Sequence, residues 1–231
     1  MTLREYPDLI QGSDEWHDLR RGIVTASTIK SLITAKTVQV ASNDKSRALT
    51  ATLVAERITG WTDDTYVSFD MARGHEIEPI AREIYSKHYA PVTEMGFMVR
   101  DRGDWGHIRI GFSPDGLVGE TGVIEIKCRR PKEHVATVLA DEVPSEHIAQ
   151  IQCGLFVSGR EWCDFISYSP GMAMWIKRVL PDQRWGDVII EAAEAFEITA
   201  AEMTAKYLAA VEGLPATERT LNPFDDEITV N

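Results

Sequence analysis

The sequence predicts an α/β protein, in the broad sense that includes α+β folds, with a central mixed β-sheet flanked by helices. Three observations support this fold class. Apolar residues recur at helical spacing near both ends of the chain, short alternating segments with glycine-rich turns fill its middle, and a helical segment separates these from two later strands. The chain of 231 residues is long enough for one sizeable domain. We expect a single domain over residues 1–231, with a long C-terminal helix and tail from about residue 182.

Four helices are expected in the first 90 residues. They are a short helix over 16–19, a segment that runs from a cap at Thr25-Ala26-Ser27 toward Leu32, and longer helices over 44–58 and 69–89. Ser13 and Asp14 are both suited to cap the first helix, because their side-chain oxygens can accept a hydrogen bond from a free main-chain N–H. Gly60 is expected to end the third helix, and Pro79 to kink the fourth.

The periodicity changes from helical to alternating after Val92. The expected elements are a meander of strands near 97–99, 108–110, 117–118 and 123–127, a helix over 146–157, strands over 162–168 and 174–180, and a helix over 187–211. The last helix carries Ile189, Phe196 and Met203 at intervals of seven. Its expected role is packing on the domain, with a subunit contact as the less favoured alternative. The tail from Ala216 is expected to be irregular.

The charge balance restricts the function. The chain has 24 Lys and Arg against 36 Asp and Glu, a net charge of −12. This argues against a protein that coats nucleic acid through a broadly basic surface. An enzyme that acts on nucleic acid remains compatible, because basic residues can be concentrated locally and divalent cations neutralise carboxylates. The local basic patches are Arg20-Arg21, Lys45 with Arg47, and Arg129-Arg130 with Lys132.

The composition, 44% hydrophobic and 26% charged, is typical of a soluble globular protein. No apolar run approaches the roughly 20 residues needed to cross a bilayer. The first residues also lack the basic and then apolar layout of a signal peptide, so we expect a cytoplasmic protein with no membrane contact. Cys128, Cys153 and Cys163 lack the paired short spacings of a zinc site, and we expect them to be reduced and mostly buried.

Asp115, Glu125 and Lys127 are the most informative residues of the chain. Residues 124–127 alternate as a strand does, so Glu125 and Lys127 project from one face while two isoleucines face the core. A hairpin with its loop at residues 120–122 would set Asp115 across from Lys127. Two carboxylates and an ammonium group would then converge.

This combination suits metal-dependent cleavage of a phosphodiester. Mg²⁺ is typically held by one or two carboxylates, with waters and the substrate phosphate as the other ligands, and Asp115 and Glu125 fit that role. Lys127 would position or deprotonate the attacking water, with a pKa lowered toward neutrality. Ser-Pro-Asp-Gly is also an ordinary turn, and Glu-x-Lys on a strand is usually a solvated pair. The apolar strand around both charges favours the site, because ionised groups are costly to bury alone.

Further polar residues can complete this site. Glu78 can supply another carboxylate, although most glutamates on helices are solvated. Gln150 and Gln152 are about 200° apart on a helix, so at most one of them enters the site, and His147 lies on the Gln150 side. The other histidines in question lack metal-ligand spacing and are expected at the surface or hydrogen-bonded in the core. They are His75, His107 and His134.

Six motifs occur in the order found in one nuclease family. They are Gly12-Ser13-Asp14-Glu15-Trp16-His17-Asp18-Leu19-Arg20, Gly22-Ile23-Val24-Thr25-Ala26-Ser27, Gly74-His75-Glu76-Ile77-Glu78, Ser113-Pro114-Asp115-Gly116, Glu125-Ile126-Lys127-Cys128 and Ala149-Gln150-Ile151-Gln152. On these motifs, which cover roughly residues 12–170, the chain resembles the lambda-type phage exonucleases, also called YqaJ-like viral recombinases, of the PD-(D/E)XK nuclease superfamily.

The resemblance implies a restriction-endonuclease-like core and a set of functional residues. The implied catalytic residues are Asp115, Glu125, Lys127, Glu78 and Gln150. The implied ligands of Mg²⁺ or Mn²⁺, with two ions per site, are Asp115, Glu125, Glu78 and the main chain of Ile126. Arg20 and Ser27 are implied near the 5′ phosphate of the DNA strand, and a guanidinium is suited to bind a phosphate with two hydrogen bonds. Asp101 resembles a further acidic position of the family, with Asp104 as its competitor.

The residues themselves indicate metal-dependent phosphodiester cleavage, and the resemblance further implies a 5′→3′ exonuclease on linear double-stranded DNA that leaves 3′ single strands for recombination. The resemblance further implies a single-strand-annealing protein as partner and a homo-oligomer, a trimer in some members. The alternatives are a structure-specific or restriction-type endonuclease with the same metal site, and a non-catalytic adaptor that binds DNA ends.

Overall fold

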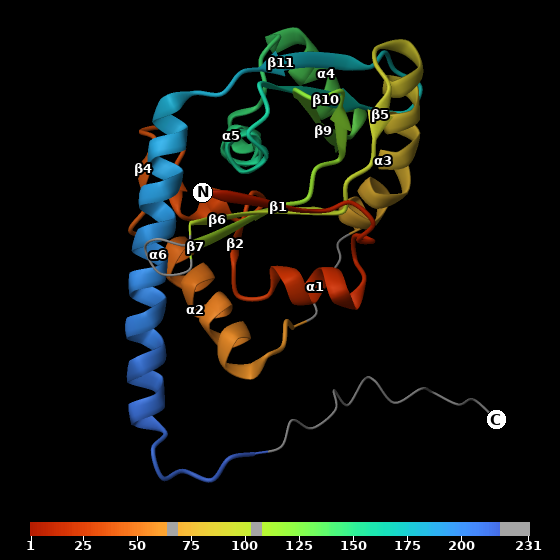
Figure 1. Cartoon of the computed structure of the whole chain (residues 1–231). Helices are drawn as coiled ribbons and strands as arrows, with labels where there is room; N and C mark the ends of the chain where they lie inside the picture. The colour runs from red at the N-terminus through yellow and green to blue at the C-terminus, as the bar shows by residue number, and fades with distance from the viewer. Residues whose placement is uncertain (64–68, 103–107, 218–231) are drawn as a thin grey trace, which may run out of the picture.

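The structure is a computed structural model that describes residues 1–63, 69–102 and 108–217. Asp104 and His107 lie outside the described residues. Within them the strands form two mixed sheets and a small hairpin of β3 (Ile33–Thr34) and β4 (Gln39–Val40). Helices cover these sheets (Figure 1), which confirms the predicted class of mixed β-structure flanked by helices, although the strands form two sheets where one central sheet was expected.

The first sheet has the strand order β1-β6-β7-β2. Its strands are β1 (Thr2–Tyr6), β6 (Phe97–Arg102), β7 (Ile108–Phe112) and β2 (Val24–Thr25). β2 pairs parallel to β7, and the other pairs are antiparallel. Phe97 and Val99 pack with Trp16 of α1 (Asp14–Arg20), whereas Met98 between them joins the main core. The alternation in β6 therefore buries both faces of this sheet.

The second sheet has the order β11-β10-β9-β8-β5 and carries the predicted site strand. Its strands are β11 (Trp175–Val179), β10 (Trp162–Tyr168), β9 (Gly122–Cys128), β8 (Gly116–Val118) and β5 (Val92–Thr93). β9 and β10 are parallel, and the other pairs are antiparallel. Ile124 and Ile126 pack with Tyr85 of α3 (Phe69–His88), while Val123 joins the main core on the opposite face.

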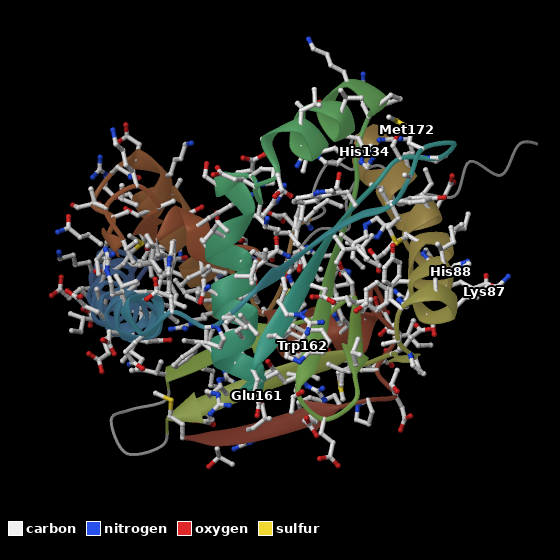
Figure 2. The ribbon with its side chains drawn as sticks, turned by 90° about the horizontal axis from the view of Figure 1, so that it is seen from above. Lys87, His88, His134, Glu161, Trp162 and Met172 are labelled. Atoms are coloured by element: carbon white, nitrogen blue, oxygen red, sulfur yellow. The ribbon has the colours of Figure 1, made fainter. Side chains whose placement is uncertain are left out.

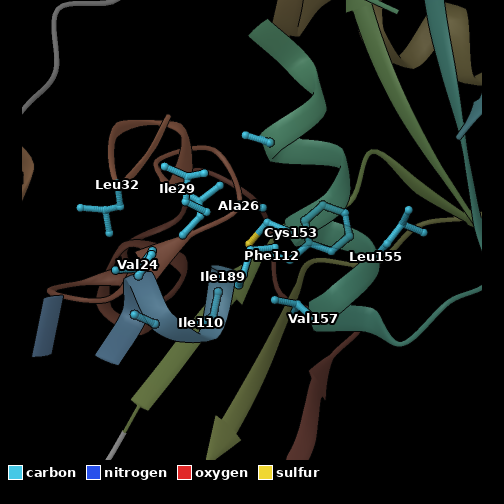
Figure 3. Close-up of a cluster of buried hydrophobic side chains, with 14 of the residues drawn as sticks. Val24, Ala26, Ile29, Leu32, Ile110, Phe112, Cys153, Leu155, Val157 and Ile189 are labelled. Atoms are coloured by element: carbon cyan, nitrogen blue, oxygen red, sulfur yellow. The ribbon is translucent and has the colours of Figure 1, made fainter. Parts of the chain in front are cut away.

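Helix α5 (Ser145–Ser158) lies between the two sheets (Figure 1). Every residue from Ile151 to Leu155 is buried, so this part of the helix exposes no face to solvent. Figure 3 shows Cys153 and Leu155 beside Phe112 of β7 in the main core. Gly154 permits this approach, because a Cβ there would lie 2.7 Å from the Phe112 ring. The core thus has one central helix shared by two sheets.

The remaining helices pack around this core. They are α2 (Asp44–Thr59), α4 (Pro131–Ala140), α6 (Gln183–Ala210) and the short 3₁₀ helix η1 (Ile29–Ser31). Helix α2 starts at a capping box of Asn43 and Ser46 and ends at Gly60, whose φ of 66° is left-handed. Helices α2 and α6 lie side by side, and α6 extends past the sheets (Figure 1). Among the described residues, no helix combines the length and apolar character needed to cross a membrane.

Several sequence predictions need correction. The segment after Thr25-Ala26-Ser27 is η1 and not an α-helix, since one 3₁₀ turn is enough to bury Ile29. The predicted meander is divided, because β6 and β7 belong to the first sheet and β8 and β9 to the second. The sequence analysis missed β1, the β3-β4 hairpin and α4, although Pro131 at the start of α4 is a recognised signal. The three cysteines are free, and Cys153 and Cys163 are buried, as expected.

Phe196 anchors α6 to the body of the protein. Its side chain is 3% exposed, and the Arg57 guanidinium of α2 lies 5.0 Å above the ring. Arg57 also donates to both carboxylate oxygens of Glu197, at 2.7 and 2.8 Å. The seven-residue spacing therefore serves packing on the domain, as the sequence predicted.

Replacing Phe196 with Ala is expected to lower the free energy of unfolding by about 3–5 kcal/mol, because it opens a cavity in the core. Denaturant unfolding followed by circular dichroism measures this change. Ile198→Ala on the same helix is the control, since Ile198 is 63% exposed and its loss should cost less than about 0.5 kcal/mol. Equal losses in both variants would contradict the assignment of Phe196 as the anchor.

Candidate active site

The hairpin of β8 and β9 sets the geometry of the site. Val118 pairs with Gly122 and Gly116 with Ile124, so the loop is formed by residues 119–121. Continuing this register places Asp115 opposite Glu125. The predicted loop was one residue too late, and the expectation that Asp115 lies across from Lys127 is wrong. Asp115 and Glu125 still share the face that α5 covers, because Val123 on that face packs in the main core.

Glu125 is a buried carboxylate at the centre of this face, with 1% of its surface exposed. Its Oε1 lies 2.5 Å from Lys127 Nζ and accepts a hydrogen bond from Gln150 Nε2 at 2.7 Å. Burial raises the pKa of Glu125 to about 7, although the neighbouring ammonium of Lys127 opposes the shift. Three residues from β9 and α5 thus meet at one oxygen.

Asp115 lies beside Glu125 and is half-buried. Its Oδ2 accepts a hydrogen bond from the main-chain N–H of Ile126 at 2.6 Å. Burial, and next the nearby charge of Glu78, raise the pKa of Asp115 to about 7, while Lys127 opposes the shift. The main chain of Ile126, which the sequence analysis assigned as a metal ligand, is therefore in direct contact with this carboxylate.

Lys127 is the cation of the cluster. Burial alone would lower the pKa of its ammonium. The charges of Glu125 and Asp115 raise this pKa by more than burial lowers it, so the net shift is upward from the ordinary value. The expectation of a pKa lowered toward neutrality is therefore wrong for the protein without metal. The physical reason is that two adjacent carboxylates stabilise the ammonium more than burial destabilises it.

Glu78 approaches the cluster from α3. β5, which follows α3 in the chain, pairs with Val118 and Leu117 of β8. Arg82 of α3 contacts the main chain of Asp115, just before β8. Glu78 Oε1 accepts a hydrogen bond from the Arg82 guanidinium at 2.7 Å. Burial raises the pKa of Glu78, and Arg82 opposes this shift. The structure therefore brings Glu78 into electrostatic contact with Asp115, Glu125 and Lys127.

Arg20 and Ser27 lie together next to this cluster. Arg20 donates to Ser113 Oγ at 3.2 Å and to Ser27 Oγ at 3.4 Å, and its guanidinium lies 4.0 Å above the Trp16 ring. Trp16 Nε1 also donates to Ser113, at 3.0 Å. Ser113 precedes Asp115 by two residues, so this group, the Arg20 pocket, is linked directly to the carboxylates.

The Arg20 pocket has the character of an anion site. Burial lowers the pKa of Arg20 to about 10, which leaves the guanidinium charged at neutral pH. In the part of the chain that the structure describes, its hydrogen-bond partners are the hydroxyls of Ser113 and Ser27, and it forms no ion pair with a carboxylate. A half-buried guanidinium whose hydrogen-bond partners are neutral hydroxyls still carries a positive charge that can bind a phosphate.

The donor atoms of the cluster fit a hard divalent cation. Within the described ranges, no group of three or more His, Cys, Asp or Glu side chains is already arranged around one point. Mg²⁺ needs only one or two carboxylates, because waters and a substrate phosphate complete its octahedron. Asp115, directly before β8, and Glu125 of β9 supply two, and burial raises the pKa of both because Lys127 offsets their charges only in part.

A cavity of about 410 Å³ opens beside Asp115 and Glu78. Loop residues 7–11 form its opposite wall. Gln11 Nε2 donates to the main-chain oxygen of Pro114 at 3.2 Å, which ties this loop to the segment that carries Asp115. Asp115 and Glu78 of the cluster thus line a cavity large enough for part of a polymer substrate.

Other residues named from the sequence lie elsewhere. Asp101 is in β6, and its carboxylate pairs with Arg4 at 3.3 Å, away from the cluster. Gln152 faces the opposite side of α5 from Gln150 and donates to the main-chain oxygen of Leu180 at 2.9 Å. One glutamine therefore enters the site, as the helical spacing required.

Among the described residues, no histidine belongs to a group of side chains arranged to hold a metal ion. His134 Nδ1 lies 2.8 Å from Ser167 Oγ and its Nε2 lies 3.0 Å from the main-chain oxygen of Ala173, so it is a hydrogen-bonded core residue, as expected. Figure 2 shows His134 on α4, far from Trp162 at the other end of β10. His147 stacks on Phe165 at 5.3 Å, and burial lowers its pKa to about 4.

The sequence analysis missed three residues that the structure places at the site. Ser113 and Trp16 belong to the Arg20 pocket, and Arg82 contacts both Glu78 and the main chain of Asp115. Arg82 had a usable signal, because an arginine four residues after a glutamate on a helix lies beside it.

Comparisons with known proteins give one family match and several similar solved structures. The YqaJ-like viral recombinase domain matches residues 15–161. A crystal structure of the alkaline exonuclease LHK-Exo from Laribacter hongkongensis is 30% identical, with a TM-score of 0.76, and the match covers 88% of this chain and 100% of that one. The same enzyme in complex with dAMP gives a TM-score of 0.74 at 30% identity, with the same coverage.

A phage-related exonuclease from Haemophilus somnus 129PT shares the fold, with a TM-score of 0.60 at 13% identity. That match covers 83% of this chain and 99% of the other. A search of curated proteins gives no match.

The buried carboxylates predict an unusual pH dependence of stability. A carboxyl group whose pKa is higher in the folded than in the unfolded state binds its proton more tightly when folded, so stability falls as the pH rises between the two values. For Glu125 this window runs from about 4.5 to about 7.

In chelator, the free energy of unfolding of the wild-type protein should fall across this window, and Glu125→Gln should remove a share on the order of 1–3 kcal/mol. Urea unfolding at pH 5 and pH 8 measures the difference. Glu142→Gln, at an exposed position, is the control and should follow the wild type. An unchanged pH dependence in Glu125→Gln would sink the interpretation.

Proposed function

Because this chain belongs to the YqaJ-like viral recombinase domain family, we propose that it is a metal-dependent 5′→3′ exonuclease that degrades one strand of linear double-stranded DNA. It would release mononucleotides and leave 3′ single-stranded tails for homologous recombination. The observation that carries this proposal is the position of the Arg20 pocket, in which a half-buried cation has hydroxyl partners. One of these partners, Ser113, lies two residues before Asp115 of the carboxylate cluster. An end-binding site beside a hydrolytic site is what an exonuclease requires.

In this proposal Asp115, Glu125 and Glu78 hold the cations, with the main chain of Ile126 as a further ligand. Bound Mg²⁺ or Mn²⁺ would supply charge to offset the phosphoryl oxygens and would lower the pKa of the attacking water. Gln150 fixes the orientation of Glu125 through its hydrogen bond. The burial of Glu125 keeps competing water away and strengthens its electrostatic interactions.

Lys127 would orient the attacking water and offset negative charge as the phosphoester is cleaved. Its raised pKa favours the charged form, so it acts here as an ammonium group and not as the general base. The contact with Glu125 fixes the position of the ammonium on β9. The 3′ oxygen of the terminal nucleotide is the leaving group.

Arg20 and Ser27 would bind the terminal 5′ phosphate. A guanidinium can give two parallel hydrogen bonds to phosphate oxygens, and the hydroxyls of Ser27 and Ser113 hold it in place. The indole of Trp16 beneath the guanidinium further limits its motion. This pocket would select a strand by its 5′ end.

The wider assembly is also part of the proposal. The substrate would be the end of a DNA duplex, and the partner would be a single-strand-annealing recombination protein. The active form would be a homo-oligomer, and the resemblance to the family favours a trimer. Because the chain has a net charge of −12, sustained digestion would depend on enclosure of the DNA by such an assembly more than on a basic surface. The complex of the Laribacter enzyme with dAMP supports a nucleotide-binding site.

The proposal is tested by digesting a linear duplex with distinguishable 5′ and 3′ labels beside a closed circle, with Mg²⁺ and with chelator. Early release of the 5′ label, an intact circle and no reaction in chelator are expected. Nicking of the circle would make the protein an endonuclease, and DNA-end binding without cleavage would make it an adaptor.

Lys127→Ala is expected to reduce the rate of this digestion roughly 100- to 1,000-fold, because it removes a charge placed at the reacting phosphate. Binding of DNA ends should persist, measured by fluorescence anisotropy with a labelled duplex. Cleavage at the wild-type rate would refute the role of Lys127.

Arg20→Ala is expected to lower the preference for 5′-phosphorylated over 5′-hydroxyl ends at least about tenfold, because charge-assisted hydrogen bonds to the phosphate are lost. The measurement is the ratio of initial rates on the two substrates. Arg21→Ala is the matched control, since Arg21 pairs with Asp18 instead. A preserved preference in Arg20→Ala would remove the phosphate pocket from the proposal.

A further inference from the structure

Arg82 uses all three nitrogens of its guanidinium to join three segments of the chain. Nε donates to the main-chain oxygen of Asp115 at 2.6 Å, and one terminal nitrogen donates to Glu78 Oε1 at 2.7 Å. The other terminal nitrogen lies 3.0 Å from Glu94 Oε2. The three partners belong to the start of β8, to α3 and to the segment before β6.

This arrangement differs from an ordinary ion pair between successive helical turns. Such pairs on the surface contribute little to stability, because solvent screens them and both side chains are mobile. The Arg82 side chain is only 15% exposed, and its partners lie on separate segments. A planar fork with three occupied nitrogens leaves a single orientation for the group.

The contacts made by Arg82 leave the carboxylate of Asp115 available. Arg82 holds Asp115 through its main-chain oxygen, whereas the carboxylate of Asp115 accepts from Ile126. On Glu78 the arginine engages Oε1. One side chain thus fixes two carboxylate residues on different elements without pairing with the carboxylate of Asp115.

We propose that Arg82 is a positioning residue that fixes Asp115 and Glu78 relative to each other, so that the pair binds the divalent cation. This inference rests on the proposed function, because it takes both carboxylates as cation ligands. Arg82 does not touch the reacting atoms, and it acts through the two residues that it holds. Groups that orient metal ligands commonly change metal affinity 10- to 100-fold when they are removed.

The test is a calorimetric titration of the DNA-free protein with Mn²⁺, together with nuclease rates over a range of Mn²⁺ concentrations. Arg82→Lys keeps the charge but replaces the planar fork, whose separate nitrogens bind Asp115 and Glu78, with one rotatable ammonium that does not fix the two residues in a single geometry. It is expected to raise the Kd for Mn²⁺ about tenfold or more. The Mn²⁺ concentration for half-maximal rate should rise in parallel, while the rate at saturating Mn²⁺ recovers to near the wild-type value.

Glu94→Gln is the matched control. The Glu94 side chain is 79% exposed and pairs with a terminal nitrogen of Arg82 that contacts neither Asp115 nor Glu78, so the Kd of the Glu94→Gln variant for Mn²⁺ should stay within about twofold of the wild type. Thermal unfolding identifies a variant that fails to fold. In that case Arg82→Gln, which keeps a planar amide donor, takes the place of Arg82→Lys.

Two results would overturn the role of Arg82 alone. They are an unchanged Kd for Mn²⁺ in a folded Arg82 variant, and a loss of rate that saturating Mn²⁺ does not restore, while the wild-type protein binds Mn²⁺ and digests DNA. A wild-type protein that binds no Mn²⁺ would remove the proposed function and this role together.

Discussion

Helix α5 is buried on every side from Ile151 to Leu155, and both sheets depend on this constraint. The first sheet packs against α5 through Phe112, where Gly154 allows close approach, and the second sheet packs against it through Phe165. The same helix donates from Gln150 to the carboxylate of Glu125. Core packing and the geometry of the site are therefore coupled, because a shift of α5 between the sheets would also move the residue that orients Glu125.

Local charge explains how an acidic chain can have a site suited to nucleic acid. The cluster concentrates carboxylates at one place, and Lys127 and Arg82 compensate them there. Arg20 lies in a separate pocket with hydroxyl partners. The raised pKa values of Asp115 and Glu125 show that this compensation is incomplete in the protein without metal. The net charge of −12 belongs to the whole chain, whereas under the proposed function the chemistry depends on these few groups.

The sequence was sufficient to predict the long elements and the composition of the site, since both depend on local periodicity and residue type. It placed Glu125 and Lys127 on one face of β9 and separated Gln150 from Gln152. It did not predict the division of the strands into two sheets, because pairing partners are decided by tertiary contacts. The upward pKa shift of Lys127 was also out of reach, since it arises from distances between charges that only the folded chain defines.

The short connection between Ser113 and Asp115 has a further consequence. Two residues span at most about 7 Å of extended chain, and Pro114 between them restricts the backbone. Ser113 contacts Arg20, while Asp115 belongs to the carboxylate cluster. Under the proposed function, the distance from a bound strand terminus to the point of hydrolysis is therefore limited by this short connection and by the hydrogen bond between Arg20 and Ser113. The number of nucleotides removed in each cycle would then be determined by this local connection, and movements elsewhere in the fold would change it little.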